Sequence, residues 1–363
     1  MNKKELVNWI GNKTRPIFVA GPCSAETEEQ VLTVAKALEA EGHVDIFRAG
    51  IWKPRTMPGN FEGMGEIALP WLKKVKEQTN LLTACEVANA THVKLALKYE
   101  VDVLWIGART AVNPFSVQEI ADAIEGRDIT VMIKNPINVD LALWMGAIER
   151  FRKSGVKNII AIHRGFSVSN ENSKYRNEPM WKVPFELRRR YPRLPIICDP
   201  SHITGKSELI GEMSQKALDL GFDGLMIESH PEPKTALSDA RQQVTPAALN
   251  DMLKELKIRQ VTSDDDIFDD ELTILRKKLD RLDAEILDVL SLRKKVTERI
   301  GRAKAKNNVT IVQPQRMKQM INDRMVNGET LELSEGYVKD IFQTIHEESV
   351  RVQTQIMDSN GID

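Results

Sequence analysis

The sequence predicts a (β/α)8 barrel followed by an all-helical domain, and three observations support this prediction. Between residues 17 and 230, short apolar runs alternate with longer amphipathic stretches, as in strand–helix units that build a parallel sheet. Beyond residue 268 the pattern becomes helical only. The length of 363 residues exceeds the roughly 250 residues of a typical barrel. We therefore expect a barrel domain over residues 1–256, a linker over 257–268 and a helical domain over 269–363.

The predicted strands are eight short runs rich in β-branched residues. The run over 101–107 is apolar at most positions, which is typical of a strand covered on both faces. Eight such strands favour a closed barrel, and an open doubly wound sheet is the alternative. The strands are expected at residues 17–22, 45–50, 81–85, 101–107, 130–135, 158–164, 195–201 and 224–230.

The barrel helices are expected where apolar residues recur at the helical period and charged residues cover the outer face. After the last of them, residues 257–266 lose this period and gather acidic side chains, which is typical of a linker. The helices are expected at residues 26–41, 66–78, 91–99, 117–124, 141–153, 207–220 and 246–256.

The first helix of the second domain is predicted from apolar residues at alternating three- and four-residue steps. A helix of roughly 30 residues, about 45 Å long, cannot be covered by its own small domain. Pro314 opens a second helix over 315–326, and Ser334 caps a third over 335–357. We therefore expect three helices completed by dimerisation. The apolar residues are Leu272, Leu275, Leu279, Leu282, Ile286, Val289, Val296 and Ile300.

The composition argues against several classes of partner. Lys and Arg number 51 against 52 Asp and Glu, so nothing in the overall charge points to nucleic acid or an anionic membrane. No segment is apolar for long enough to cross a bilayer, and the start lacks a signal-peptide pattern. Three cysteines show no disulfide spacing. We expect a cytoplasmic protein.

Cations follow the predicted strands at the barrel mouth. Arg48, Lys53 and Arg55 lie within a loop that two prolines and a glycine stiffen. A solvated basic loop is the simpler interpretation, but Arg109, Lys134 and Arg164 follow other strands in the same way. Like charges gathered in one cavity repel one another, and polyanionic ligands would offset this repulsion. We therefore expect two phosphorylated substrates, for which phosphoenolpyruvate and a sugar-phosphate aldehyde fit the charge.

Four potential metal ligands also follow strands, namely Cys23, His202, Glu228 and Asp239. A thiolate, an imidazole and two carboxylates suit Mn²⁺, Fe²⁺, Co²⁺ or Zn²⁺, which would act as a Lewis acid on a carbonyl oxygen. Taken singly, each has a structural interpretation as a buried cysteine, a satisfied histidine or a capping acid. A class I aldolase that uses Lys134 as a Schiff base is the competing chemistry.

Six motifs over residues 15–255 resemble the 3-deoxy-D-arabino-heptulosonate 7-phosphate synthases, in the short-barrel branch related to 3-deoxy-octulosonate 8-phosphate synthase. The sister family typically carries Ala-Asn-Arg-Ser after the loop lysine, so Pro-Arg-Thr here implies erythrose 4-phosphate as the acceptor. Lys134 precedes Asn-Pro, where many relatives have Arg-Gly. The motifs are Ala20-Gly21-Pro22-Cys23-Ser24, Lys53-Pro54-Arg55-Thr56, Ile106-Gly107-Ala108-Arg109, Asp199-Pro200-Ser201-His202, Ile227-Glu228-Ser229-His230-Pro231 and Leu237-Ser238-Asp239-Ala240.

This resemblance implies a role for each candidate residue. Arg109 and Arg164 would hold the phosphate of phosphoenolpyruvate, and Arg55 with Thr56 the phosphate of erythrose 4-phosphate. The carboxylate of phosphoenolpyruvate would meet Arg48, Lys53 and Lys134. The metal on Cys23, His202, Glu228 and Asp239 would polarise the aldehyde, and loss of inorganic phosphate would follow attack by the enol carbon.

In the helical domain, Arg293 interrupts the apolar stripe, and Lys304 lies three turns further on the same face. A charge in an apolar seam is costly unless it meets an anion. Arg276 points about a quarter turn away and could reach into a partner chain, while Ser349 and Gln353 share one face of the third helix. Snorkelling cations beside a polar rim are the alternative.

Residues 270–357 resemble the all-helical chorismate mutases, which are intertwined dimers. The resemblance implies that Arg293 and a partner chain's Arg276 grip the carboxylates of chorismate, with Lys304 and Gln353 on its ether oxygen and Arg316 and Ser349 in support. A unimolecular rearrangement needs only such a preorganised pocket.

Two positions depart from the mutase pattern. Gln313 stands where the family often has an acidic residue, and Met317 where it has a glutamate. The two resemblances together imply a bifunctional enzyme of aromatic biosynthesis, and because the first step and the branch-point step are fused we expect prephenate to inhibit it. A noncatalytic dimerisation domain that senses prephenate or chorismate is the alternative.

Overall fold

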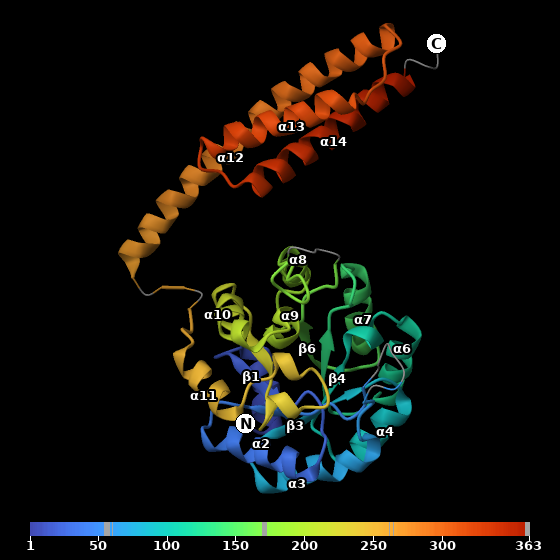
Figure 1. The fold of residues 1–363 in the computed structure, drawn as a ribbon, viewed down its shortest axis with the longest axis vertical. Coiled ribbons are helices and arrows are strands. Elements are labelled where there is room, and N and C mark those ends of the chain that lie inside the picture. The colour runs from blue at the N-terminus through green and yellow to red at the C-terminus, as the bar shows by residue number, and fades with distance from the viewer. Residues whose placement is uncertain (54–58, 60, 169–172, 261, 264, 360–363) are drawn as a thin grey trace. The chain divides into compact units, whose positions relative to one another are not determined.

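The computed structural model describes residues 1–53, 59, 61–168, 173–260, 262–263 and 265–359. It divides the chain into two compact units, Met1–Val261 and Thr262–Asp363 (Figure 1). The first unit contains all the strands and the second contains helices only, within the described residues.

The first unit is a closed barrel of eight parallel strands in chain order. The last strand pairs with the first, with Ile17 opposite Gly224, so the sheet has no open edge. This confirms the closed barrel and rules out the open sheet. The strands are β1 (Ile17–Gly21), β2 (Ile46–Arg48), β3 (Leu82–Val87), β4 (Val103–Ile106), β5 (Thr130–Lys134), β6 (Asn158–His163), β7 (Ile196–Cys198) and β8 (Gly224–Glu228).

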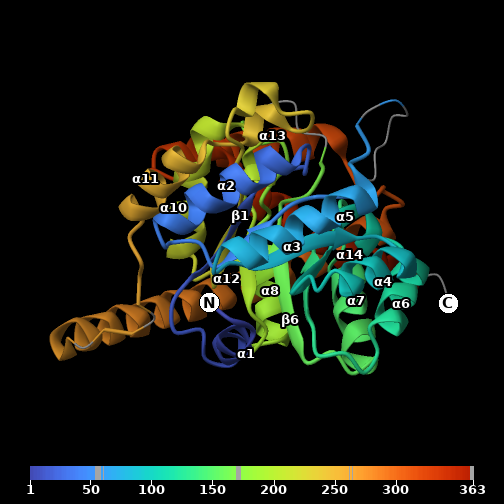
Figure 2. The same ribbon diagram turned by 90° about the horizontal axis from the view of Figure 1, so that it is seen from below.

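Helices surround this sheet (Figures 1 and 2). Two of them, α1 and α8, were not predicted from the sequence pattern, and α5 and α9 are single short turns after β4 and β7. The α-helices of this unit are α1 (Lys3–Asn12), α2 (Glu28–Ala40), α3 (Leu69–Gln78), α4 (Ala90–Lys98), α5 (Ala108–Ala111), α6 (Pro114–Ala123), α7 (Leu141–Lys153), α8 (Lys182–Arg190), α9 (Pro200–Thr204), α10 (Ile210–Asp219) and α11 (Pro246–Glu255).

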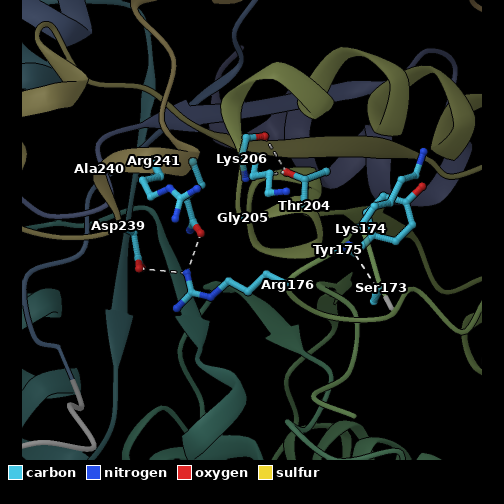
Figure 3. Close-up of a pocket in the computed structure, with 11 residues that line it drawn as sticks. Ser173, Lys174, Tyr175, Arg176, Thr204, Gly205, Lys206, Asp239, Ala240 and Arg241 are labelled. Carbon is cyan, nitrogen blue, oxygen red and sulfur yellow. Dashed lines mark hydrogen bonds and ion pairs between the residues drawn. The ribbon is translucent and has the colours of Figure 1, made fainter. Parts of the chain in front are cut away.

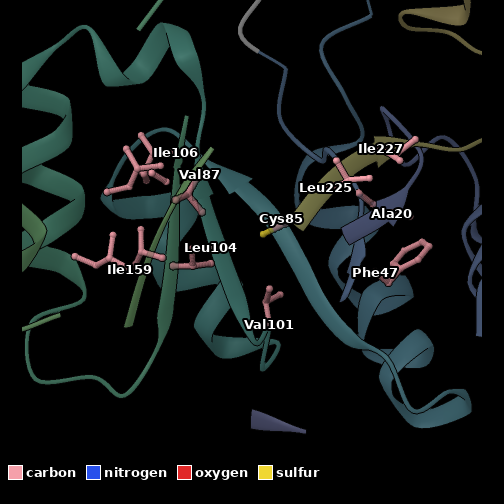
Figure 4. Close-up of a cluster of buried hydrophobic side chains, with 14 of the residues drawn as sticks. Ala20, Phe47, Cys85, Val87, Val101, Leu104, Ile106, Ile159, Leu225 and Ile227 are labelled. Carbon is pink, nitrogen blue, oxygen red and sulfur yellow. The ribbon is translucent and has the colours of Figure 1, made fainter. Parts of the chain in front are cut away.

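The hydrophobic core has two layers because successive strand residues point to opposite faces. The outer layer packs the sheet against the helices and includes Phe47, Cys85 and Leu104 (Figure 4). The inner layer fills the barrel itself. Leu6 and Trp9 of α1 belong to that inner layer, so α1 closes the base of the barrel.

The second unit consists of α12 (Asp266–Lys306), α13 (Pro314–Glu329) and α14 (Glu335–Ser359). At 41 residues, α12 is longer than the predicted helix because it begins inside the acidic segment expected to be linker. The Asp265 side chain accepts hydrogen bonds from the backbone N–H groups of Ile267 and Phe268 and so caps the helix. Acidic residues in a first turn also suit the helix dipole.

This helical unit buries little apolar surface. Among its described residues the buried hydrophobic side chains are Val338 and Val352, both on α14. The predicted stripe of α12 is exposed instead, each side chain between 45% and 63%, except for Leu272, which is half-buried. Ile274 and Leu292, which were not part of the prediction, are exposed beside it. No helix in the described part of the chain is both long and apolar enough to span a membrane. The exposed stripe comprises Ile274, Leu275, Leu279, Leu282, Ile286, Val289, Leu292, Val296 and Ile300.

Candidate active sites

The barrel mouth receives its polar groups from the inward-facing row of each strand. Along β2, Ile46 lies in the barrel interior and Arg48 follows two residues later; along β8, Met226 is followed by Glu228. The same step leads from Met132 to Lys134. Alternation therefore keeps the lower barrel apolar and places charged side chains at the carboxyl ends of the strands, where active sites of such barrels lie.

The four predicted metal ligands gather at this mouth. Single ligand atoms of Cys23, Glu228 and Asp239 all lie within 4.8 Å of one another. The Cys23 thiol sulfur is 3.5 Å from Asp239 Oδ2, and His202 Nε2 is 3.8 Å from Glu228 Oε1. His202 is thus beside the other three, although it is outside the 4.8 Å group found among the described residues.

His202, Glu228 and Asp239 each have one polar atom bound to a neighbour and another that faces the centre. His202 Nδ1 lies 3.0 Å from Asp199 Oδ1, which leaves Nε2 with a free lone pair. Glu228 Oε2 accepts a hydrogen bond of 2.7 Å from the side chain of Gln242. Its other oxygen, Oε1, is buried without a hydrogen-bond partner among the described residues. A centre of this kind fits a divalent cation.

The protonation of the ligands agrees with a cation at this point. Burial, reinforced by the Glu228 charge, raises the pKa of the Cys23 thiol to about 12. Burial lowers the pKa of His202, so its ring is neutral at pH 7. Burial opposes ionisation of Asp239, but the charges of His202 and Arg176 outweigh it and lower the pKa of this carboxyl. A divalent ion would displace the thiol proton and offset the two carboxylates.

Arg48 is the most enclosed of the predicted substrate-binding cations, at 1% exposure. Its guanidinium lies over the Trp105 ring at 4.7 Å and forms an ion pair with Glu228 at 3.3 Å. Its Nε and Nη1 groups find no hydrogen-bond partner among the described residues. Two buried, unsatisfied N–H groups of one arginine are suited to a carboxylate or phosphate ligand.

Two lysines adjoin this arginine. Lys53 Nζ lies 3.2 Å from the Cys23 sulfur and also donates to the Cys23 carbonyl. Lys134 Nζ pairs with Asp199 at 2.7 Å, and both groups are buried. Burial raises the pKa of Asp199, but the charges of His202 and Lys134 hold it well below its usual range. Asp199 thus joins a predicted metal ligand, His202, to a predicted substrate-binding residue, Lys134.

The remaining predicted cations lie toward the rim. Arg164 follows β6 and donates to Asn177 Oδ1 at 2.9 Å. Burial lowers its pKa to about 10, and the charges of Arg176 and Arg109 act in the same direction. Arg109 is exposed on α5. Arg55 and Thr56 lie outside the described residues.

Four residues that the sequence interpretation left without a role also belong to this site. Asp199 orients His202, and Gln242 and Arg176 contact the carboxylate ligands. Glu86, at the end of β3, accepts from the Trp105 indole at 3.1 Å and occupies the space a side chain at Gly107 would need. Asp199 precedes His202 by three residues, a helix N-cap spacing that could have revealed it. Arg176 and Gln242 carry no comparable signal in the sequence.

The loop after β1 is tied to the loop after β8. The Cys23 backbone N–H donates to Gln243 Oε1 at 2.9 Å, and the hydroxyls of Ser24 and Ser238 share a hydrogen bond. Asp239 itself adopts a left-handed backbone with φ of 47°, which aspartate tolerates better than most residues. Together these contacts bring two metal ligands, 216 positions apart in the chain, to one side of the mouth.

A second cavity, of about 430 Å³, lies between α12 and α14. Arg293 and Ser349 both line it, and Arg293 Nη1 donates to the Ser349 hydroxyl at 2.5 Å. Burial and the nearby Arg324 charge lower the pKa of Arg293. Gln353 is buried one turn beyond Ser349, and its Oε1 has no partner in the described part of the chain. This cavity is cationic and partly apolar, as an aromatic or cyclic dianion requires.

Lys304, Arg276 and Arg316 are not among the residues that line this cavity. Lys304 Nζ donates to the Ile311 carbonyl at 2.6 Å. Arg276 and Arg316 are exposed. Arg276 precedes Arg293 by 17 residues of one continuous helix, which separates them by about 25 Å. One chain therefore cannot bring both arginines to one small ligand.

Comparison with protein families gives two matches. Residues 3–263 match the DAHP synthetase I family, and residues 275–354 match chorismate mutase type II. Each match corresponds to one of the two compact units.

Individual relatives resemble the barrel. The phospho-2-dehydro-3-deoxyheptonate aldolase of Thermotoga maritima is 31% identical over 248 residues, covering 68% of this chain and 70% of the relative. The 2-dehydro-3-deoxyphosphooctonate aldolase of Pelobacter propionicus is 31% identical over 265 residues, covering 67% and 90%. The crystal structure of the Thermotoga maritima DAHP synthase is 28% identical, with a TM-score of 0.60 over 67% of this chain and 68% of that one.

Proposed function

The chain belongs to the DAHP synthetase I family and carries a chorismate mutase type II domain, and from this premise we propose a reaction and a set of residues for each unit. The barrel condenses phosphoenolpyruvate with erythrose 4-phosphate, giving 3-deoxy-D-arabino-heptulosonate 7-phosphate and inorganic phosphate. The helical domain rearranges chorismate to prephenate. Both reactions serve aromatic biosynthesis, and the three free, buried cysteines are consistent with a cytoplasmic setting.

The observation that carries the synthase proposal is the buried cation cluster beside the four-ligand centre. The unsatisfied N–H groups of Arg48 bind the carboxylate of phosphoenolpyruvate, together with Lys53 and Lys134. Arg164 and Arg109 bind its phosphate, since their mutual repulsion is relieved by a dianion. Arg55 and Thr56 remain assigned to the phosphate of erythrose 4-phosphate by resemblance alone.

Cys23, His202, Glu228 and Asp239 would hold Mn²⁺, Fe²⁺, Co²⁺ or Zn²⁺, which polarises the aldehyde oxygen when bound. The cations fix the enol carbon C3 over the aldehyde carbon, and a new C–C bond forms between them. Water then adds at C2, and cleavage of the C2–O bond releases inorganic phosphate. Arg48 and Lys53 lie where negative charge must be balanced through these steps.

The ion pair of Lys134 argues against a Schiff-base mechanism. Its Nζ is held at 2.7 Å by the buried Asp199 carboxylate, so the nitrogen that a Schiff base would need is already engaged in an ion pair. Treatment with a chelator should abolish synthase activity, and Mn²⁺ should restore it. Borohydride added with substrate should trap no adduct; a covalent adduct at Lys134 would replace the metal mechanism with the class I aldolase mechanism.

The cavity that contains Arg293 and Ser349 carries the mutase proposal. Arg293 grips one carboxylate of chorismate, with Ser349 and Arg316 in support, and Gln353 offers its amide to the ether oxygen together with Lys304. The second carboxylate needs Arg276 from another chain, because the Arg276 of the same chain is about 25 Å away along α12. We therefore propose a homodimer formed through the exposed stripe of α12.

Chorismate consumption by the whole protein and by Arg293→Ala tests this assignment. We expect saturable turnover that falls roughly 100- to 1000-fold in the variant, because one charge-assisted contact to the reacting dianion is lost. Lys294→Ala, a neighbouring cation that lines the same cavity, is the control and should retain most activity. Prephenate binding without turnover would instead identify the domain as a sensor, for which Met317 and Gln313 would be the reason.

Prephenate is also the proposed feedback inhibitor of the synthase, since the first step and the branch-point step reside on one chain. Synthase rates measured with saturating prephenate should fall severalfold. A rate that is unchanged across that titration would remove the regulatory part of the proposal and leave both activities in place.

A further inference from the structure

Two side chains outside the four metal ligands control how the carboxylate ligands face the centre. Gln242 follows Asp239 by three residues and is 1% exposed. Its amide N–H donates to Glu228 Oε2 at 2.7 Å, while its amide oxygen accepts from Arg176 Nη1 at 2.6 Å. The same Nη1 group lies 3.0 Å from Asp239 Oδ1. Arg176 and Gln242 therefore link Glu228 and Asp239 through a continuous chain of hydrogen bonds.

This chain of hydrogen bonds occupies one oxygen of each carboxylate and leaves the other oxygen directed toward the predicted metal centre. Glu228 Oε2 accepts a hydrogen bond from Gln242. Glu228 Oε1 has no hydrogen-bond partner among the described residues; it lies 3.8 Å from His202 Nε2 and forms the ion pair with Arg48 at 3.3 Å. Asp239 Oδ1 is bonded to Arg176, whereas Oδ2 lies 3.5 Å from the Cys23 sulfur. The two oxygens that Gln242 and Arg176 leave unbound are thus the ones that face the other predicted ligands.

Arg176 is held in place although its side chain is 47% exposed. Its backbone N–H donates to the Thr204 carbonyl at 3.3 Å. Gly205, which has a φ of +65°, lies against its stem: a Cβ there would come within 2.6 Å of the Arg176 Cβ. Figure 3 shows the guanidinium reaching across a cavity of about 450 Å³ toward Asp239. The aliphatic part of the Arg176 side chain is therefore confined, and this directs the guanidinium toward Asp239.

We propose that Gln242 and Arg176 are positioning residues that present Glu228 Oε1 and Asp239 Oδ2 to the metal ion. The inference rests on the proposed metal site and assigns no contact with substrate. Partners of metal ligands commonly contribute 10- to 100-fold to affinity, because they fix the orientation of groups that would otherwise rotate. The positive charge of Arg176 opposes a bound cation, but its exposure to solvent screens that repulsion.

The test is Mn²⁺ titration of the metal-free full chain by calorimetry, with Gln242→Leu and Arg176→Gln as the principal variants. Each should bind Mn²⁺ roughly 10- to 100-fold more weakly than the unmodified protein. Arg176→Lys should be intermediate, because one ammonium retains the charge but not the planar fork. The control is Arg241→Gln, which removes a cation that lines the same cavity and makes no hydrogen bond to the four ligands among the described residues.

A second measurement separates positioning from substrate binding. At saturating Mn²⁺ the variants should recover most of kcat with little change in the KM for either substrate, and the thiolate-to-Co²⁺ absorption band should shift in the cobalt-loaded protein. Affinities equal to or tighter than that of the unmodified protein, with an unchanged band, would overturn the inference. Absence of Mn²⁺ binding by the unmodified chain would instead overturn the proposed metal site. Mutase activity and tryptophan fluorescence check that each variant is folded.

Discussion

The two sites differ in how completely one chain builds them. At the barrel mouth every predicted metal ligand is held by hydrogen bonds or ion pairs from other residues of the same unit. In the helical unit, Arg293 and Ser349 meet, but Arg276 lies on the same long helix and cannot approach them. A closed barrel concentrates eight strand ends at one point, whereas a small set of helices leaves a site open to a second copy.

Burial explains this difference. The barrel unit has a continuous core on both sides of its sheet, so it can enclose paired charges such as Arg48 with Glu228. The described helical residues bury two hydrophobic side chains and expose the apolar stripe of α12. We infer that metal-dependent condensation depends on the chain's own interior, while the mutase depends on association.

The strongest test of this contrast is Glu228→Gln. This change keeps the shape of the side chain but removes a buried charge that faces the predicted metal centre. Loss of metal polarisation, worth several kcal/mol, should lower synthase kcat by roughly 1000-fold. Mutase activity of the same sample should not change. A matched substitution of a surface acid, Glu186→Gln on α8, should leave both activities intact. Equal losses in both activities would show that the sites are not independent.

Leu279→Glu tests the dependence of the mutase on association. Leu279 is 59% exposed on α12, and a glutamate there would be buried in an apolar dimer seam at a cost of several kcal/mol. The dimer should weaken by roughly 100-fold, and mutase activity should become concentration-dependent in the micromolar range. Arg281→Glu, on the opposite side of the helix, is the control. Ultracentrifugation that finds Leu279→Glu still fully dimeric would place the interface elsewhere.

The smallest expected effect concerns acid stability of the barrel. His163 is fully buried among Trp144, Phe166, Trp181 and Phe222, and burial lowers its pKa to about 3. The unfolded chain, with an ordinary histidine pKa near 6.5, then binds a proton that the folded barrel does not. Stability should therefore fall as the pH drops below about 6.5, by about 2 kcal/mol between pH 7 and pH 5.

Urea unfolding followed by tryptophan fluorescence measures this effect in the barrel alone, because all six tryptophans precede residue 182. His163→Phe keeps an aromatic ring in the cage and should remove most of the loss between pH 7 and pH 5. An identical acid dependence in the variant would assign the loss to other groups.

Much of the barrel could be predicted because its strands are buried on both faces and therefore read as apolar runs. Two helices could not. Helix α1 is a short segment whose Leu6 and Trp9 pack under the barrel, and α8 contains Pro184 followed by a run of arginines. The sequence pattern predicts a linker where α12 begins. The acidic residues there cap the helix and form its first turn, but in sequence they resemble a charged loop.

At the site, residues at strand ends could be placed by position alone. Arg176 and Gln242 could not, because each acts through a hydrogen bond between loops that are 66 residues apart. Such pairs depend on the closed sheet bringing the loops together, and no local pattern encodes them. The ligand site at the cavity between α12 and α14 could be inferred only in part, since in our proposal Arg276 of another chain completes it.

The pairing of β1 with β8 has a consequence for synthesis of the chain. Ile17 must wait for Gly224 before the sheet can close, so one edge of β1 keeps unpaired backbone groups until nearly 230 residues have been synthesised. At roughly 5–20 residues per second, that interval lasts from about ten seconds to under a minute. The α12 stripe is translated only afterwards. All eight barrel strands are therefore synthesised before the segment through which we propose that two chains associate.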